Sequence, residues 1–191
     1  MLNLVLLREL GIMDNICCGQ MTKSNVCIFV EKLTDISMLQ RACSFTIGKD
    51  SKASLSKLYD CEHSPIRTQM FWIEMKDIPT FVAVHFSRHK VGVEHYILTK
   101  RDDRGGDKKE DRYTPINHAM FLNAQSLINM ARKRLCKGAH WQTVEVMQGI
   151  KDCIKLVDPD LYLYLVPECI YRGNVCHELK SCGLCKKKEL T

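Results

Sequence analysis

The sequence has no apolar run long enough to cross a bilayer, which excludes an ordinary transmembrane helix. Its first apolar stretch, residues 1–7, is short and is followed by Arg8 and Glu9, so we do not expect a signal peptide. Internal repeats and low-complexity segments are also absent. What is present is ordinary for a globular protein. The 191 residues, 46% hydrophobic and 26% charged, suffice for one domain with a sizeable core.

A regular disulfide framework is missing too, although the chain holds eleven cysteines. Their number is odd, their spacing is irregular, and several, such as Cys27, Cys136 and Cys153, lie in apolar runs. This pattern favours reduced thiols in a cytoplasmic protein.

The cysteines of the tail leave one alternative open. Cys182 and Cys185 have the two-residue spacing of a zinc knuckle, but six residues separate Cys169 from Cys176, so a second such pair is missing. We therefore expect no metal, with a structural zinc ion as the alternative. Its candidate ligands are Cys169, Cys176, Cys182 and Cys185.

The net charge of +6 suits an anionic partner, but it does not distinguish a nucleotide from a nucleic acid or a membrane surface. Part of the excess is local, in residues 108–109 and 186–188, which we interpret as solvated loops.

The pattern of apolar residues predicts a chain with both strands and helices. The clearest helix is predicted from about residue 117 to 136, because Met120, Ala124 and Leu127 begin an apolar stripe at helical spacing. A second helix is predicted over about 139–157. Strands are predicted near residues 26–30 and 70–75, and residues 80–86 fit either a strand or a buried helix. We divide the chain into an N-terminal extension (1–24), one domain (25–178) and a basic tail rich in cysteine and lysine (179–191).

Arg88-His89-Lys90 follows an apolar run directly. Three potentially cationic side chains at the end of a buried element are costly unless an anion meets them, and a phosphate does so well. A basic turn facing solvent is the alternative. Asn123 and Arg134 are eleven residues apart, three helical turns, so a helix would place them on one face.

Residues 79–90 resemble the segment that leads into the Arg-His-Arg signature of flavin-dependent thymidylate synthases. Residues 123–134, with Ala139-His140-Trp141, are similar to the Asn-x-Arg-Ser-Leu helix and the Ala-Gln-Trp-Glu stretch of that family. Weaker matches are residues 41–45 and the turn at 61–65. The blocks keep the family's order over roughly residues 25–178.

The resemblance implies a single α/β domain with a mixed or antiparallel sheet flanked by long helices, like thymidylate synthase-complementing proteins. It implies reductive methylation of a deoxyuridine-type pyrimidine nucleotide, with FAD as cofactor and with NADPH and methylenetetrahydrofolate as co-substrates. It also implies a homotetramer whose sites are shared between subunits. The implied flavin contacts are Ser44, Arg88, His89, Lys90, Asn123 and Asn129. The implied nucleotide contacts are His85, Leu98, Thr99, Lys100, Gln125 and Arg134, with Arg134 also polarising the base.

Several positions depart from the family pattern. Leu98 stands where the family has serine, Lys90 and Gln125 where it has arginine, and Arg67-Thr68 where it has Glu-His. Most of these changes fall at nucleotide-facing positions, so flavin binding is better preserved than the usual choice of substrate. An altered pyrimidine substrate therefore stays open. A catalytically inactive relative that binds a nucleotide or nucleic acid is the competing hypothesis, and a small zinc protein is the third.

Overall fold

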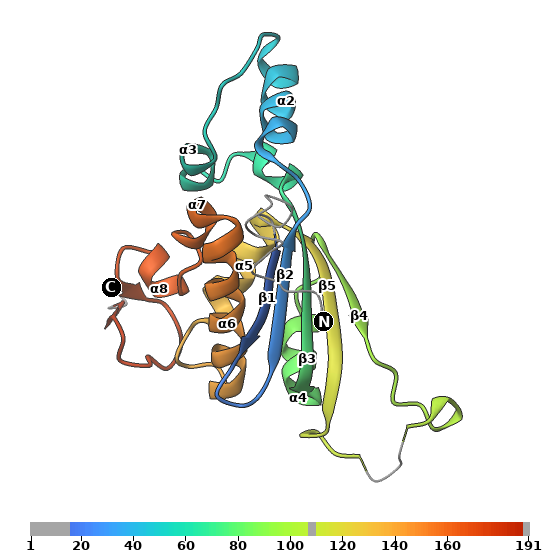
Figure 1. The fold of residues 1–191 in the computed structure, drawn as a ribbon. Helices are drawn as coiled ribbons and strands as arrows, with labels where there is room; N and C mark the ends of the chain where they lie inside the picture. The colour runs from blue at the N-terminus through green and yellow to red at the C-terminus, as the bar shows by residue number, and fades with distance from the viewer. Residues whose placement is uncertain (1–15, 107–109, 189–191) are drawn as a thin grey trace.

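The computed structural model describes residues 16–106 and 110–188 and contains an antiparallel sheet with the strand order β1-β2-β3-β5-β4 (Figure 1). Every neighbouring pair in this sheet is antiparallel. A separate pair of short parallel strands, β6 and β7, lies in the C-terminal segment. The strands are β1 (Ile16–Met21), β2 (Cys27–Lys32), β3 (Met70–Pro79), β4 (Val93–Ile97), β5 (Pro115–Asn123), β6 (Val175–Cys176) and β7 (Lys186–Lys187).

Helices cover one face of the sheet, and the longest of them, α6, packs against β1 and β2 (Figure 1). The α-helices are α2 (Ile36–Ile47), α3 (Leu55–Asp60), α4 (Thr80–Ser87), α5 (Ala124–Arg134), α6 (Trp141–Val157), α7 (Pro159–Tyr162) and α8 (Glu168–Tyr171). Two short 3-10 helices are η1 (Ser64–Thr68) and η2 (Asp102–Arg104). This architecture confirms the predicted α/β domain with an antiparallel sheet. None of the described helices is long and apolar enough to span a membrane.

One face of the sheet is apolar and buried, whereas the other carries both apolar and charged residues and is only partly buried. Alternate residues such as Ile28, Ile73 and Met120 are fully buried beneath the helices, as the two-residue period of a strand requires. Their neighbours on the opposite face, such as Trp72 and Phe121, are only partly buried. The core is therefore a single layer between the sheet and α4, α5 and α6.

The predicted helix over 117–136 is wrong in its first third. Residues up to Asn123 belong to β5, where Met120 pairs with Ile73 of β3 and the buried residues alternate. Only from Ala124 does the chain become helical, with Asn123 as its N-cap: the Asn123 side chain accepts from the backbone N–H of Ser126 at 2.9 Å. Apolar residues two and four apart fit both periods over so short a stretch, so pairing with β3 decided the outcome.

Two other expectations change. Residues 80–86, open between strand and helix, are helical in α4. The N-terminal extension predicted for residues 1–24 contains β1, which pairs with β2 and so belongs to the sheet. Pairing with β1 satisfies the backbone N–H and C=O groups on the edge of β2 that does not face β3. The sequence pattern did not reveal this strand. Residues 1–15 lie outside the described part.

An arm made of α2, α3 and their connection projects from one end of the sheet (Figure 1). A buried polar cluster holds its base to the helical layer. Asp158, at the end of α6, forms an ion pair with Lys32 at 2.8 Å and accepts a hydrogen bond from the Tyr59 hydroxyl at 2.9 Å. Burial, followed by the charge of Asp158, raises the pKa of Tyr59 far above its usual value, so that the hydroxyl stays protonated and donates.

Candidate functional site

The Arg88-His89-Lys90 turn, here called the signature turn, follows α4 and precedes β4. It is held against the start of α5. Ser126 donates from its hydroxyl to the carbonyl of Val91 at 2.9 Å, and a Cβ atom on Gly92 would come within 2.5 Å of that same hydroxyl. Gly92 also has a φ of +69°, so glycine is required there on both counts. Arg88 and Lys90 are exposed, whereas His89 is partly buried.

The far end of α5 returns to the signature turn. Arg134 donates from Nε to Nε2 of His89 at 2.9 Å. Burial and the charge of Arg134 lower the pKa of His89 to about 4, so the ring is neutral at pH 7 and its Nε2 can accept. Because Nε2 accepts, the ring proton must lie on Nδ1. The signature turn, which the resemblance assigns to the flavin, and Arg134, which it assigns to the nucleotide, are therefore in contact within one chain.

Positive charge is concentrated around this contact. Arg88 is the chain neighbour of His89, which Arg134 contacts, and burial followed by the charge of Arg88 lowers the pKa of Arg134. Across the described ranges, neither arginine forms an ion pair with a carboxylate. Two neighbouring arginines without a carboxylate partner are well suited to an anion such as a phosphate.

His85 lies in α4, three residues before Arg88. Its Nδ1 lies 2.8 Å from the hydroxyl of Thr143 at the start of α6, and its ring meets Phe81 edge-on. Phe81 in turn contacts the ring of His140, with centroids 4.6 Å apart. Burial, followed by the charges of Arg134 and Arg88, lowers the pKa of His85. His85 is therefore a neutral, hydrogen-bonding group beside the two arginines.

A pair of histidines lies behind the signature turn. Nε2 of His95 in β4 is 2.7 Å from the carbonyl oxygen of His89, and its Nδ1 is 3.0 Å from Nε2 of His118 in β5. His118 is buried, and desolvation, followed by His95, lowers its pKa to about 4. In the sequence these histidines looked isolated. Only the register of β4 on β5, which pairs His95 with Met120 and Ile97 with His118, brings them together.

The opposite face of α5 carries a second polar cluster, here called the Glu62 cluster. Glu62 accepts from Gln125 Nε2 at 2.6 Å and forms an ion pair with Arg132. Arg132 also lies over the ring of Tyr171, 3.5 Å from its centroid, and donates to Oδ1 of Asn129 at 3.3 Å. Gln125 and Asn129, predicted to share a site with Arg134, are thus directed away from it within one chain.

Comparison with known proteins finds partial similarity to the family that the sequence motifs resemble. No family model matches the chain. It is 34% identical over 62 residues to the flavin-dependent thymidylate synthase of Clostridium tetani and 30% identical over 81 residues to that of Sulfolobus acidocaldarius. These segments are 32% and 40% of this chain, but only 24% and 31% of those relatives.

The structure of thymidylate synthase X from Helicobacter pylori, solved with FAD and dUMP, superposes with a TM-score of 0.56. The superposition covers 74% of this chain and 98% of that one, at 12% identity. The chain is therefore similar in fold to this structure and, over part of its length, similar in sequence to the two flavin-dependent thymidylate synthases.

The remaining positions that the thymidylate synthase resemblance singled out lie away from the signature turn. Leu98, Thr99 and Lys100 follow the other end of β4, five to seven residues beyond Val93, a span of roughly 17–23 Å for extended chain. Leu98 lines a pocket of about 560 Å³ that His95 and His118 also border. Lys100 is paired with Glu110 at 2.8 Å.

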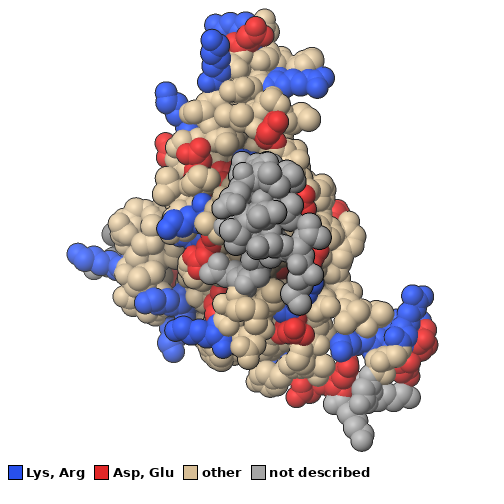
Figure 2. Space-filling model, in the orientation of Figure 1, with Lys and Arg blue, Asp and Glu red and all other residues tan. Residues whose placement is uncertain are grey.

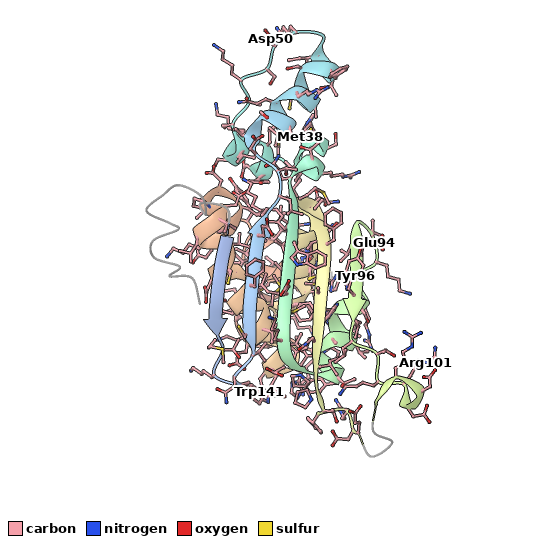
Figure 3. The ribbon with its side chains drawn as sticks, turned by 45° about the vertical axis from the view of Figure 1, so that its right-hand side comes forward. Met38, Asp50, Glu94, Tyr96, Arg101 and Trp141 are labelled. Carbon is pink, nitrogen blue, oxygen red and sulfur yellow. The ribbon has the colours of Figure 1, made fainter. Side chains whose placement is uncertain are left out.

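Ser44 lies in the arm, where its hydroxyl donates to the carbonyl of Gln40 at 2.9 Å. Figure 3 shows the arm, marked by Met38 and Asp50, at one end of the molecule, with Arg101 and Trp141 near the other. Within one chain, Ser44 in α2 is therefore remote from Leu98, Thr99 and Lys100, which lie between β4 and Arg101.

The cysteines named as alternative zinc ligands are thiols without disulfide bonds. Burial and the neighbouring thiol of Cys185 raise the pKa of Cys169 to about 11, so this thiol stays protonated. Cys182 lies beside Cys136 of the helical layer, and its proximity contributes to a raised pKa there. In the part of the chain that the structure describes, no three His, Cys, Asp or Glu side chains are arranged to hold one metal ion.

Proposed function

We propose that the chain is a flavin-dependent thymidylate synthase-like enzyme that binds FAD and a deoxyuridine-type pyrimidine nucleotide. One observation carries the proposal: Arg134 reaches His89 of the signature turn, beside Arg88, and the described carboxylates leave both guanidinium groups unpaired. A planar guanidinium group can bind a phosphate through two parallel hydrogen bonds. A basic turn that only faced solvent would not require a second arginine from a distant helix to contact it.

The side chains at the turn fit an anionic cofactor and nucleotide. Arg88 and Lys90 are exposed and available to phosphate oxygens, and His89 can donate from Nδ1 because Arg134 occupies its Nε2. Arg134 keeps its charge in a partly buried place, where it can stabilise negative charge that develops on a pyrimidine ring. FAD would supply reversible hydride transfer, with NADPH and methylenetetrahydrofolate as co-substrates.

Separation of the predicted contacts motivates a second element of the proposal, an assembly in which subunits share each site. Gln125 and Asn129 lie on the face of α5 opposite Arg134, and Ser44 lies in the arm. One chain cannot direct all of them at a single ligand, whereas neighbouring subunits can. We propose the homotetramer that the family resemblance implies and a cytoplasmic setting for it.

The competing candidate is a catalytically inactive relative that binds a nucleotide or nucleic acid. The Glu62 cluster favours it, because Gln125 stands at a family arginine position and is already bonded to Glu62. Figure 2 gives nucleic acid less support, since Lys and Arg are scattered among Asp and Glu on the face it draws.

A flavin titration with three nucleotides separates these candidates. The purified protein is expected to bind FAD, and reduced nicotinamide is expected to bleach the flavin spectrum. Deoxyuridine, deoxycytidine and thymidine monophosphates would then be titrated by their effect on that spectrum, and methyl transfer to the preferred one measured. Flavin binding without turnover supports the inactive relative. Protein that takes up no FAD contradicts both the enzyme and its flavin site.

A further inference from the structure

We infer that His95 and His118 are positioning residues for the signature turn: together they fix the carbonyl of His89 and thereby the direction of its ring toward Arg134. The inference rests on the proposed function only where flavin binding is measured. Its structural part concerns three histidines and one arginine joined by contacts of 2.7, 3.0 and 2.9 Å.

The protons of this chain of contacts can be assigned one by one. The carbonyl of His89 can only accept, so His95 must carry a proton on Nε2. In a neutral imidazole the other nitrogen then lacks a proton, so Nδ1 of His95 accepts from Nε2 of His118. His118 stays neutral, because a charged ring would be buried beside another histidine. Both rings are therefore Nε2–H tautomers.

Burial of His118 holds the histidine pair in place but leaves one ring nitrogen without a hydrogen-bond partner within residues 16–106 and 110–188. His118 is 1% exposed, and its Nδ1 has no hydrogen-bond partner among the described residues. A buried acceptor without a partner is unfavourable, and a core position next to Met120 would accept an apolar residue without that cost. The gain from histidine here is the hydrogen bond to His95, which no apolar residue provides.

The consequence reaches the candidate site through the backbone. His89 is tied at three points: its N–H donates to Phe86 at 3.0 Å, its carbonyl accepts from His95, and its ring accepts from Arg134. Removing the middle contact frees the peptide unit to rotate, and the ring follows it. Arg134 then loses a fixed partner, although neither His95 nor His118 touches it.

Substitution of His95 separates positioning from mere packing. His95→Phe keeps a ring of similar size but cannot donate, whereas His95→Gln keeps a donor and an acceptor on one amide. Histidine nitrogen NMR reports each tautomer directly. We expect wild-type His89 as a single Nδ1–H tautomer and a mixture in His95→Phe, with flavin affinity lowered on the order of tenfold. His95→Gln is expected to restore much of both, and His177→Phe, at an exposed tail position, to change neither.

Each outcome bears on the inference. An Nδ1–H tautomer for His95 or His118 in the wild-type protein overturns it without any variant, which covers the case that His95→Phe fails to fold. Unchanged His89 tautomers and flavin affinity in a folded His95→Phe variant also overturn it. If the wild-type protein binds no FAD, the proposed function fails while the tautomer measurement still decides the positioning role.

Discussion

The two faces of α5 treat charge in opposite ways. On one face Arg134 lies beside Arg88 and bonds to a neutral histidine, with no carboxylate partner among the described residues. On the other face Arg132 is neutralised by Glu62 and covered by Tyr171. Two arginines two residues apart on one helix thus have different environments. Arg134 is free to bind an anion, whereas Arg132 is already paired with a carboxylate of the same chain.

Because of this difference, substitutions of the two arginines are expected to affect different properties: ligand binding for Arg134 and folding stability for Arg132. An arginine without a carboxylate contributes little to folding, and its removal should affect ligand chemistry. An arginine in a partly buried ion pair behaves the other way, because removing one partner leaves the other uncompensated. Substitutions on the Arg134 face should therefore change ligand binding and turnover, and substitutions on the Arg132 face should change the free energy of unfolding.

The largest expected effect belongs to Arg134. Arg134→Ala should lower turnover by on the order of 10²–10³-fold while changing the free energy of unfolding little, because the lost interactions are with ligand and with developing charge. Lys133→Ala, the neighbouring residue in an exposed pair with Glu178, is the matched control and should leave turnover unchanged. Steady-state kinetics and urea unfolding on both variants make the test. Equal losses of turnover in the two variants would contradict a specific role for Arg134 in binding the ligand.

A pH effect on stability is expected from the histidines behind the Arg134 face. The folded protein holds the pKa of His118 at about 4, below its ordinary 6.5, so the unfolded state takes up the proton first as pH falls. Stability should therefore decline between pH 6.5 and 4, by about 3 kcal/mol at most from this residue. Urea unfolding of wild type and His118→Phe across this range measures it. The variant should show a smaller decline, and parallel curves for the two proteins would rule the contribution out.

What the sequence could predict differs between the two faces as well. The α/β fold was predicted from the residue pattern and the family resemblance, and the structure confirms it. The resemblance assigned Arg88-His89-Lys90 and Arg134 to the ligands of one site, and His89 and Arg134 are in contact in the structure. The Glu62 cluster was not predicted, because it joins residues 62, 125, 132 and 171 through tertiary packing. The separation of Asn129 from Arg134 follows from helical geometry, since five residues correspond to about 500°, well away from one face.

Glu62 should matter to folding more than to chemistry. Glu62→Ala leaves Arg132 partly buried without its carboxylate, and we expect a loss of about 2 kcal/mol in the free energy of unfolding. Glu178→Ala removes the carboxylate that pairs with Lys133, an exposed residue of the same helix as Arg132, and should cost under about 0.5 kcal/mol. Chemical unfolding of both variants compares them directly. A Glu62→Ala protein as stable as Glu178→Ala would mean that the Glu62 cluster is not the closed, self-neutralised face described above.

The smallest expected effect is that of substituting Asn129. Its amide oxygen accepts hydrogen bonds within the chain, whereas its amide nitrogen is left to donate to a ligand. Arg132 at 3.3 Å and Gln125 at 3.4 Å both donate toward Oδ1, so the exposed Nδ2 is the atom left to donate to a ligand. Asn129→Asp keeps an acceptor beside Arg132 and replaces the outward N–H donor with a charged carboxylate oxygen. Stability should change by less than about 0.5 kcal/mol. Flavin affinity should fall several-fold if a neighbouring subunit presents its flavin to this face, since an acceptor then meets a carboxylate instead of an N–H. Titration of FAD at protein concentrations above and below subunit dissociation tests the two conditions together. A loss of affinity seen only in the assembled protein would show that the closed face of α5 serves a neighbour's site, whereas an unchanged affinity in both states would leave that face with a purely structural role.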